Sequence, residues 1–407
     1  MISTDRITYY AVLGLFIALL VPYTKHLFNA WGLRSAYILG LSCTISYLLT
    51  PVVRSGASAL NVVDLPGPRK VHAHQTPLMG GLAIYVAFVC AIFANFIFTA
   101  QIKGILIGST IVVVIGVIDD FVGVGARTKL AVQLAATAIV MASGVTLVLI
   151  PQAWIGSTLL NGAITILWIV GITNAMNFFD GMDGLAPGLA AVISFFLGIL
   201  AFQTHQLYLG WLAIAVFGAS AGFLPFNFPR NGPASIFLGD TGSMFLGFVL
   251  ACLAVLGKWA EHSPIVSISA PLLIFSVLIF DMVHTSVTRF HTGKISNVLE
   301  WVDYKGGKDH LHHRLAEVLP APRQCVLFIL LLSFCLGLTS TVLRNVQTRD
   351  AVLLIVQAVV ILLLVTILEN VTRWRRENEK ERQSPVSTEG EHTVSPTAPD
   401  EAEDDAP

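Results

Sequence analysis

Long apolar runs separated by polar segments make up most of this 407-residue chain. Each run is close to the roughly 20 residues that an α-helix needs to cross the ~30 Å hydrocarbon core of a membrane. We count twelve runs, at about 8–28, 35–53, 80–100, 104–119, 129–151, 158–176, 187–204, 208–226, 237–257, 265–288, 324–343 and 351–371. The pattern predicts an all-α fold, a polytopic transmembrane helical bundle of about 11–12 spans, because the first two runs form either two spans or one span and an interfacial helix.

The composition excludes an ordinary soluble protein. Hydrophobic residues make up 55% of the chain and charged residues 12%, with a mean hydropathy of +0.75, whereas about a quarter of the residues of a soluble domain are charged. Residues 376–407 hold 10 acidic and 3 basic side chains, which leaves 21 basic and 15 acidic ones before them. A cationic membrane part suits anionic headgroups or phosphorylated substrates, although basic cytoplasmic loops also occur for topological reasons alone.

The connections between the runs alternate in length. Every second connection is long and polar, at about 54–79, 119–128, 174–186, 227–236 and 289–323, and the chain beyond 372 continues the series. Most lysines and arginines lie in or next to these segments, with exceptions such as Lys25, Lys103 and Lys258. The positive-inside rule therefore places the long connections on the cytoplasmic side of the membrane.

The last thirty residues differ from the rest in composition. They are rich in Glu, Asp, Ser, Thr and Pro and contain few large apolar side chains, so they cannot bury enough surface to offset the entropy of ordering. We divide the chain into a multi-pass membrane domain, 1–375, and a disordered acidic cytoplasmic tail, 376–407.

Three of the long connections carry acidic motifs. Asp119 and Asp120 are adjacent where an apolar run ends, which fits either a solvated helix end or a Mg²⁺ site with phosphate and water as further ligands. The sequence 174–183 spaces Asn174, Asn177, Asp180 and Asp183 three residues apart, so that a continued helix would align them, whereas Gly181 and Gly184 indicate a frayed end that a ligand can approach.

The fourth and fifth long connections add further polar groups. Asp240 lies in a Gly-Asp-Thr-Gly-Ser sequence just before an apolar run, where side chains cap a helix or its N–H groups bind phosphate. The fifth connection contains His310, His312, His313 and Arg314. Clustered histidines can bind zinc, but this sequence has no HExxH motif and no cysteine beside them. The histidines and the arginine therefore favour a site that binds a diphosphate.

Together these motifs resemble one enzyme family. In order they read DxPxxRKxH from Asp64, IDDF, NxxNxxDGxDGL, FxGDTGS and HLHHR, and they span Asp64 to Leu315. The set resembles the polyprenyl-phosphate N-acetylhexosamine-1-phosphate transferases, which are polytopic helical enzymes. The resemblance implies transfer of a sugar 1-phosphate from a UDP-sugar to a polyprenyl phosphate at the cytoplasmic face, with Mg²⁺ or Mn²⁺ as cofactor.

The resemblance also implies a role for each motif residue. Asp240 binds the metal with Asn177 as a second ligand, Asp119 and Asp120 lie beside the reacting phosphates, and Lys129 contacts the diphosphate. Phe237 stacks on uracil, and Gly181 and Asp183 recognise the edge of the base. The catalytic set is then Asp119, Asp120, His310, His312 and His313, and the substrate-binding set is Lys70, Lys129, Asp180, Gly181, Asp183, Phe237 and Arg314.

The HLHHR motif is more similar to the branch that uses UDP-GlcNAc than to the branch that makes the first peptidoglycan lipid intermediate. We therefore expect transfer of GlcNAc-1-phosphate to undecaprenyl phosphate, with another UDP-HexNAc or UDP-MurNAc-pentapeptide as the alternative. Partners are then the two substrates and membrane lipids, with no nucleic acid, and a homodimer is left open. A transporter is an alternative from another class, but it would carry charges near mid-span, whereas the charges here lie at the ends of the apolar runs. A receptor or scaffold is a third alternative, and only the acidic tail favours it.

Overall fold

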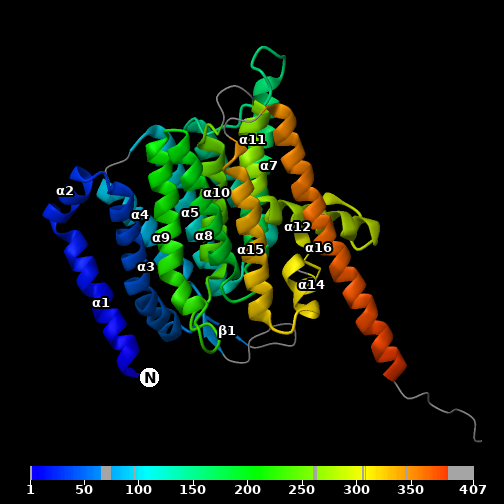
Figure 1. Ribbon diagram of the computed structural model, residues 1–407, viewed down its shortest axis with the longest axis horizontal. Coiled ribbons are helices and arrows are strands. Elements are labelled where there is room, and N and C mark those ends of the chain that lie inside the picture. Colours follow the sequence, from blue (N-terminus) through cyan, green and yellow to red (C-terminus); the bar gives the residue numbers. More distant parts are fainter. Residues whose placement is uncertain are drawn as a thin grey trace, which may run out of the picture.

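The computed structural model describes residues 2–65, 75–95, 98–259, 264–304, 307, 309–343 and 347–383. Nearly all of them are helical (Figure 1), which confirms the predicted all-α bundle. The first helices and strands are α1 (Ile2–Leu20), α2 (Pro22–Ala30), α3 (Arg34–Ala59), β1 (Val63–Asp64), β2 (Thr76–Pro77), α4 (Gly81–Asn95), α5 (Ala100–Val122), α6 (Ala126–Ala142), α7 (Ser157–Phe178) and α8 (Leu185–Gln203). They are followed by α9 (Leu207–Asn227), α10 (Gly239–Leu256), α11 (Pro264–Ile274), α12 (Ser276–His291), α13 (Val298–Asp303), α14 (Leu311–Val318), α15 (Pro322–Ser340) and α16 (Thr348–Gln383).

Each of the twelve apolar runs corresponds to a helix or a bent pair of helices. Eight helices in the described ranges are long and apolar enough to cross a membrane, and the pairs α1–α2 and α11–α12 raise this number to ten if each pair is one span. The other two runs form α4 and α6, which have 15 and 17 residues. The bundle therefore has the architecture of a polytopic membrane protein.

Two expected helices have other shapes. The run at 265–288 was expected to be one span, but α11 and α12 meet at Phe275 with a bend of 78°. The run at 129–151 was also expected to be one span, but α6 ends at Ala142 and is followed by Gly144 with φ +94°. Beyond that glycine, the side chain of Asn161 on α7 binds the backbone of Leu149 and Ile150. The apolar pattern locates these segments but does not encode their breaks.

Helix α10 is the centre of the bundle. Of its most apolar stretch, 89% of the residues are buried within the protein, against 22% for α16. It packs against α4, α5, α7, α8 and α9, and Figure 1 shows it among these helices. Because other helices surround it, the N-terminus of α10 lies inside the protein, where its N–H groups need partners.

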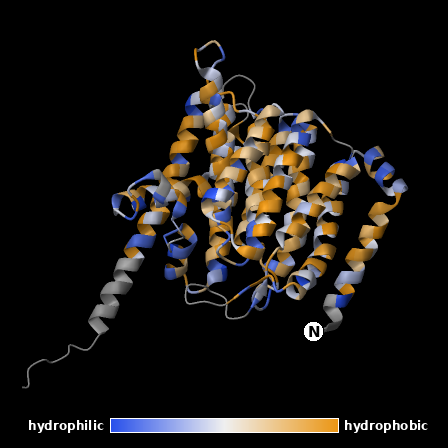
Figure 2. Ribbon diagram, turned by 180° about the vertical axis from the view of Figure 1, so that it is seen from behind, coloured by the Kyte–Doolittle hydropathy of each residue, from blue (hydrophilic) through white to orange (hydrophobic). Residues whose placement is uncertain are grey.

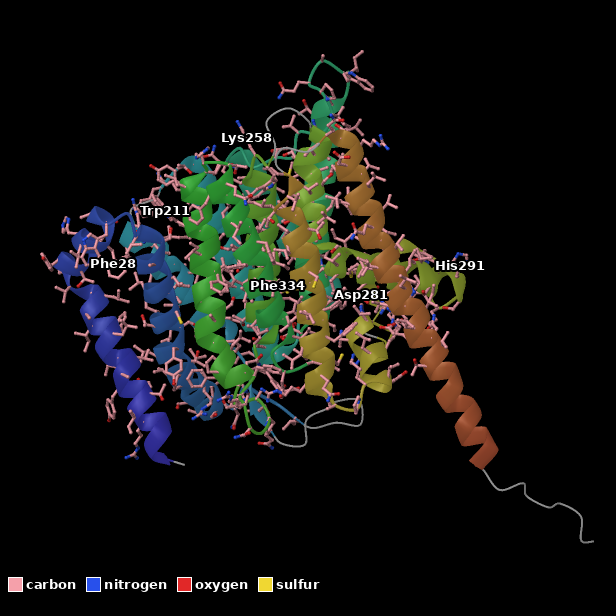
Figure 3. All side chains as sticks on the ribbon, in the orientation of Figure 1. Phe28, Trp211, Lys258, Asp281, His291 and Phe334 are labelled. Carbon is pink, nitrogen blue, oxygen red and sulfur yellow. The ribbon has the colours of Figure 1, made fainter. Side chains whose placement is uncertain are left out.

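The motif-bearing connections lie at one end of the bundle, which we call the loop face. Figure 1 shows β1 and α14 at this end, and β1 pairs antiparallel with β2 through Val63–Pro77 and Asp64–Thr76. Figure 2 shows hydrophobic residues over most of the length of the helices and hydrophilic residues toward their ends. Lys258 lies at the opposite end (Figure 3). The predicted gathering of the motif loops on one side is therefore present in the fold.

The C-terminal helix is longer than the last apolar run. α16 continues to Gln383, so it extends past the expected start of the acidic tail at 376. Residues 384–407 lie outside the described part of the chain. The division at 375 remains a prediction from composition.

The start of α4 touches the start of α10 backbone to backbone. A Cβ atom on Gly81 would lie 2.0 Å from the Cα atom of Gly242. The N–H groups of Gly80 and Gly81 donate to the carbonyls of Phe237 and Leu238, at 2.9 Å each. The first long connection is thereby fixed against the residues that lead into α10.

Replacing Gly81 by alanine should destabilise the protein. The added methyl group meets backbone atoms that cannot move aside, and overpacking of this kind costs about 1–3 kcal/mol or more. We expect a lower Tm of the detergent-solubilised protein. Gly171 on α7 is the matched control, because nothing lies within 4 Å of its added Cβ, and Gly171→Ala should keep or raise the Tm. Equal Tm values for the two variants would contradict the proposed contact.

Candidate active site

The side chain of Asp120 on α5 caps the buried N-terminus of α10. Its Oδ1 accepts a hydrogen bond from the Asp240 N–H at 2.9 Å, and its Oδ2 accepts from the N–H and the hydroxyl of Thr241 at 3.3 and 2.6 Å. Gly239 precedes these residues with φ +74°, and a Cβ there would lie 2.5 Å from Asp120 Oδ2. Only glycine fits this position without strain. The cap fixes the end of α5 against the start of α10.

Three carboxylates meet at this junction. One oxygen each of Asp119, Asp120 and Asp240 lies within 4.8 Å of the others. The ammonium group of Lys129 on α6 lies between two of them, 2.7 Å from Asp119 Oδ2 and in contact with Asp240 Oδ2. The N–H of Val124 also donates to Asp119. Residues far apart in the chain therefore form one compact charged cluster.

The cluster has the chemistry of a divalent-cation site. Three carboxylates held together repel one another unless a cation neutralises them, and Lys129 supplies one positive charge at that position. Carboxylate oxygens are the ligands that Mg²⁺ prefers, with phosphate and water completing its coordination. The predicted residues Asp119, Asp120 and Asp240 thus fit a divalent metal ion.

Asn177 lies beside the cluster, as the sequence predicts, but it presents its amide nitrogen. Its Nδ2 donates to Asp240 Oδ1 at 3.1 Å and to Ser243 Oγ at 2.9 Å. Asn174, one helical turn earlier on α7, binds Gln133 of α6 instead, at 2.7 Å. Asn177 therefore orients the Asp240 carboxylate in this arrangement.

The turn between α7 and α8 carries the other two predicted acids of this motif. Because α7 ends at Phe178, Asp180 and Asp183 do not continue the helical face of Asn174 and Asn177. Burial raises the pKa of Asp180 well above its usual value, and the charges of Asp240, Asp120 and Asp183 raise it further. Asp183 Oδ2 accepts from the N–H of Ala234 at 2.9 Å, which ties this turn to the connection between α9 and α10.

A cavity of about 1040 Å³ opens at the loop face next to the cluster. Its lining includes eight residues that the sequence predicts for the site, which are Asp119, Asp120, Asp180, Gly181, Asp183, Phe237, Asp240 and His313. Phe237 is held in place from the first long connection, because its N–H donates to the Pro77 carbonyl at 2.8 Å. The predicted motifs therefore converge on one cavity large enough for a nucleotide-sized ligand.

His310 lies in a buried polar network behind the cavity. Its Nδ1 bonds to Asp281 Oδ2 at 2.7 Å, and Asp281 Oδ1 accepts from the N–H of Leu311 at 2.6 Å. Arg289, which pairs with Asp309, lies 3.2 Å from His310 Nε2. Asp281 (Figure 3) is fully buried. These contacts anchor the start of α14, which carries the next two histidines.

His312 and Arg314 are buried and do not belong to the cavity lining. His312 is buried against Phe179 and under Gly181, where an added Cβ would lie 2.5 Å from its Nε2. Burial lowers the pKa of His312 well below its usual value, and the neighbouring histidines His313 and His310 lower it further. Arg314 is buried between His284 on α12, at 2.6 Å, and Glu369 on α16, at 3.4 Å. Of this motif, His313 is the side chain that lines the cavity.

The predicted residue Lys70 lies outside the described residues. Several other residues that hold or line the site were not predicted from the sequence. Asp281 interrupts the apolar run 265–288, and an acidic group inside such a run is a recognised signal for a functional or paired site. Asn227 holds two connections together through the N–H of Gly184 and the carbonyl of Ile236, and Arg323 lines the cavity. No local pattern distinguishes these last two residues.

Comparison with known proteins agrees with this geometry. The model of the family described as Glycosyl transferase family 4 matches residues 102–258. The chain is 33% identical over 315 residues, 76% of this chain and 84% of the relative, to a Bacillus subtilis protein named probable undecaprenyl-phosphate N-acetylglucosaminyl 1-phosphate transferase. It is 32% identical over 358 residues to the decaprenyl-phosphate N-acetylglucosaminephosphotransferase of Mycobacterium tuberculosis, covering 79% of this chain and 86% of that protein.

A third relative is the phospho-N-acetylmuramoyl-pentapeptide-transferase of Halalkalibacterium halodurans. It is 31% identical over 244 residues, which cover 54% of this chain and 73% of the relative. The match to the first two relatives extends over most of both proteins, and the residues matched by the family model include Asp119, Asp120, Lys129 and Asp240. The chain therefore belongs to glycosyl transferase family 4, among the polyprenyl-phosphate N-acetylhexosamine-1-phosphate transferases.

Proposed function

We propose that this protein transfers GlcNAc-1-phosphate from UDP-GlcNAc to undecaprenyl phosphate and releases UMP. The observation that carries the proposal is the cluster of Asp119, Asp120 and Asp240 around Lys129 at the wall of the cavity. A diphosphate needs cations, and this cluster offers one cation of its own and a site for a divalent one. The names of the Bacillus and Mycobacterium relatives favour GlcNAc as the sugar.

In this reaction, an oxygen of the lipid phosphate attacks the β-phosphorus of the nucleotide sugar, and UMP leaves. Two anions must meet, so electrostatic stabilisation of the charge on the phosphates supplies much of the catalysis. A bound Mg²⁺ or Mn²⁺, held by Asp240 with Asp119 and Asp120, would neutralise the diphosphate and the developing charge on UMP. Lys129 would then turn from the carboxylates to a phosphate oxygen.

Asp119 directs the attacking phosphate in this proposal through the cations that it holds, because two anions repel each other. The second pKa of a phosphate monoester is about 6, so the lipid phosphate is largely ionised near neutral pH and needs no strong base. Asp119 is already bonded to Lys129 and to the N–H of Val124, which fixes the direction of its carboxylate. The role of Asp120 is to cap α10 and hold the cluster together.

The nucleoside occupies the rest of the cavity. Phe237 lies where its ring can stack on uracil, and Gly181 and Asp183 line the same wall. His313 contacts the diphosphate or the sugar, whereas His310, His312 and Arg314 position α14 through their buried contacts. The lipid phosphate reaches the cluster from the membrane at the ends of α5 and α10.

The proposal places the loop face in the cytoplasm of a bacterial cell, at the inner membrane. Most of the basic residues flank the loop connections, as the positive-inside rule requires for a cytoplasmic face. UDP-sugars are made in the cytoplasm, so the donor meets its site there. The product, undecaprenyl-diphosphate-GlcNAc, would begin the synthesis of a cell-envelope polysaccharide such as O-antigen, common antigen or a teichoic acid linkage unit.

Replacing Asp240 by asparagine tests the role of the cluster. The variant removes one carboxylate charge but keeps the size of the side chain, so UMP release from UDP-GlcNAc and undecaprenyl phosphate should fall by on the order of 10²-fold or more. Asp350→Asn is the control, because this exposed acid at the start of α16 is outside the cavity lining. Full activity of a folded Asp240→Asn protein would disprove the assigned role of Asp240.

A panel of donors tests the identity of the sugar. The purified protein should release UMP with undecaprenyl phosphate as acceptor when the donor is UDP-GlcNAc, and at least about tenfold more slowly with UDP-GalNAc or UDP-MurNAc-pentapeptide. Radiolabelled lipid product is the readout. If the protein prefers UDP-GalNAc or UDP-MurNAc-pentapeptide, the assigned sugar is wrong but the reaction class is kept. If no donor gives a lipid product, the reaction class is wrong.

A further inference from the structure

Arg323 stands out among the side chains that line the cavity. Six lining residues are carboxylates, namely Asp64, Asp119, Asp120, Asp180, Asp183 and Asp240. In the described part of the chain, Arg323 is the only lysine or arginine of that lining. It lies in the first turn of α15, after the histidine motif, and its side chain is exposed. The sequence motifs that describe the site do not include it.

The guanidinium of Arg323 is held in a defined position. Its Nη1 donates to the carbonyls of Pro229 and Arg230 at 2.9 and 2.7 Å, and its Cζ lies 4.6 Å from the centre of the Phe228 ring. Phe228 is itself packed over Gly184, since a Cβ there would lie 2.5 Å from the ring. A guanidinium carries five N–H groups, so the N–H groups on Nε and Nη2 remain to serve a ligand in the cavity.

The connection between α9 and α10 runs from the residues that hold this guanidinium to the carboxylate cluster. It folds back on itself, because Ser235 N–H donates to the Phe226 carbonyl at 2.8 Å and Asn227 Nδ2 donates to the Ile236 carbonyl at 3.0 Å. One end of the resulting hairpin leads directly to Asp240. Its tip, residues 228–234, carries the contacts of Arg323. The cavity wall therefore has the cluster of Asp119, Asp120 and Asp240 at one end of this connection and the guanidinium at its tip, where Asp183 Oδ2 accepts from the Ala234 N–H.

We infer that Arg323 determines base specificity by donating a hydrogen bond to the carbonyl oxygen at C4 of uracil. The inference rests on the proposed function, which places the diphosphate at the carboxylate cluster. The reacting sugar phosphate must remain where the lipid phosphate reaches it, beside the helix ends. The nucleobase lies on the other side of the diphosphate, so it extends toward the hairpin tip and Arg323.

The chemistry of the guanidinium gives this contact its selectivity. Arginine only donates hydrogen bonds, and uracil presents a carbonyl oxygen at C4 where cytosine presents an amino group. A donor that faces another donor leaves both groups without a partner, which is costly where the bound base keeps water away from them. Arg323 should therefore favour uridine over cytidine nucleotides by on the order of 10- to 100-fold.

Calorimetric binding of UMP and CMP to the full-length protein in detergent, with Mg²⁺ present, tests the inference. Both ligands lack the GlcNAc group, so their affinities measure binding at the nucleoside part of the cavity. Wild type should bind UMP more tightly than CMP by at least about tenfold. Arg323→Gln should lose most of the UMP affinity and the preference. Arg323→Lys keeps the charge without the planar group of donors, and it should not restore the preference.

Arg230→Gln is the matched control, because Arg230 is an exposed arginine at the same hairpin tip and Arg323 contacts only its backbone carbonyl. It should bind both ligands as wild type does, and the Tm of each variant confirms that it is folded. A wild-type protein that binds no UMP would reject the proposed function. Wild-type binding with an unchanged UMP preference in Arg323→Gln would reject the role of Arg323 alone. Unchanged UMP affinity with weakened UDP-GlcNAc affinity would assign Arg323 to the sugar and reject the nucleobase contact.

Discussion

The buried N-terminus of α10 is the constraint on which the site depends. The first N–H groups of a helix have no partner within the helix, and the residues at the start of α10 are buried among other helices, where these groups need an acceptor from the protein. Asp120 supplies the acceptor from α5. Its neighbour Asp119 is thereby brought next to Asp240, and the resulting negative charge requires the ammonium of Lys129. One structural requirement of the fold thus assembles the charged centre of the candidate active site.

The other connections are fitted around this centre. The end of the first connection and the start of α4 bond to the backbone of Phe237 and Leu238, and Gly81 touches α10 at Gly242. These contacts set the position of Phe237 in the cavity wall. Asp281 holds the start of α14 from the bent helix α12, so His313 faces the cavity while its neighbours stay buried. The helix ends form a rigid frame for the connections. Hydrogen bonds from side chains in and next to these connections determine which groups line the cavity.

The sequence predicts the bundle and most of the acidic residues of the cavity wall because both depend on local patterns. Apolar runs locate all twelve helices or helix pairs, and short acidic motifs locate Asp119, Asp120, Asp183 and Asp240. The break at Phe275 and the end of α6 escape prediction, since hydropathy does not encode the direction of a helix. Arg314 was expected at the substrate, but its partner Glu369 lies 55 positions later, and only tertiary packing brings the two together.

The central claim is that Lys129 and a divalent cation share the same carboxylates. The most direct test is a titration of the purified protein with Mn²⁺, followed by electron paramagnetic resonance, in wild type and in the Asp240→Asn and Lys129→Gln variants. The account predicts one bound Mn²⁺ per chain, about tenfold or more weaker binding in Asp240→Asn, and tighter binding in Lys129→Gln, because that variant removes the competing positive charge. Equal Mn²⁺ affinity in all three proteins would contradict it.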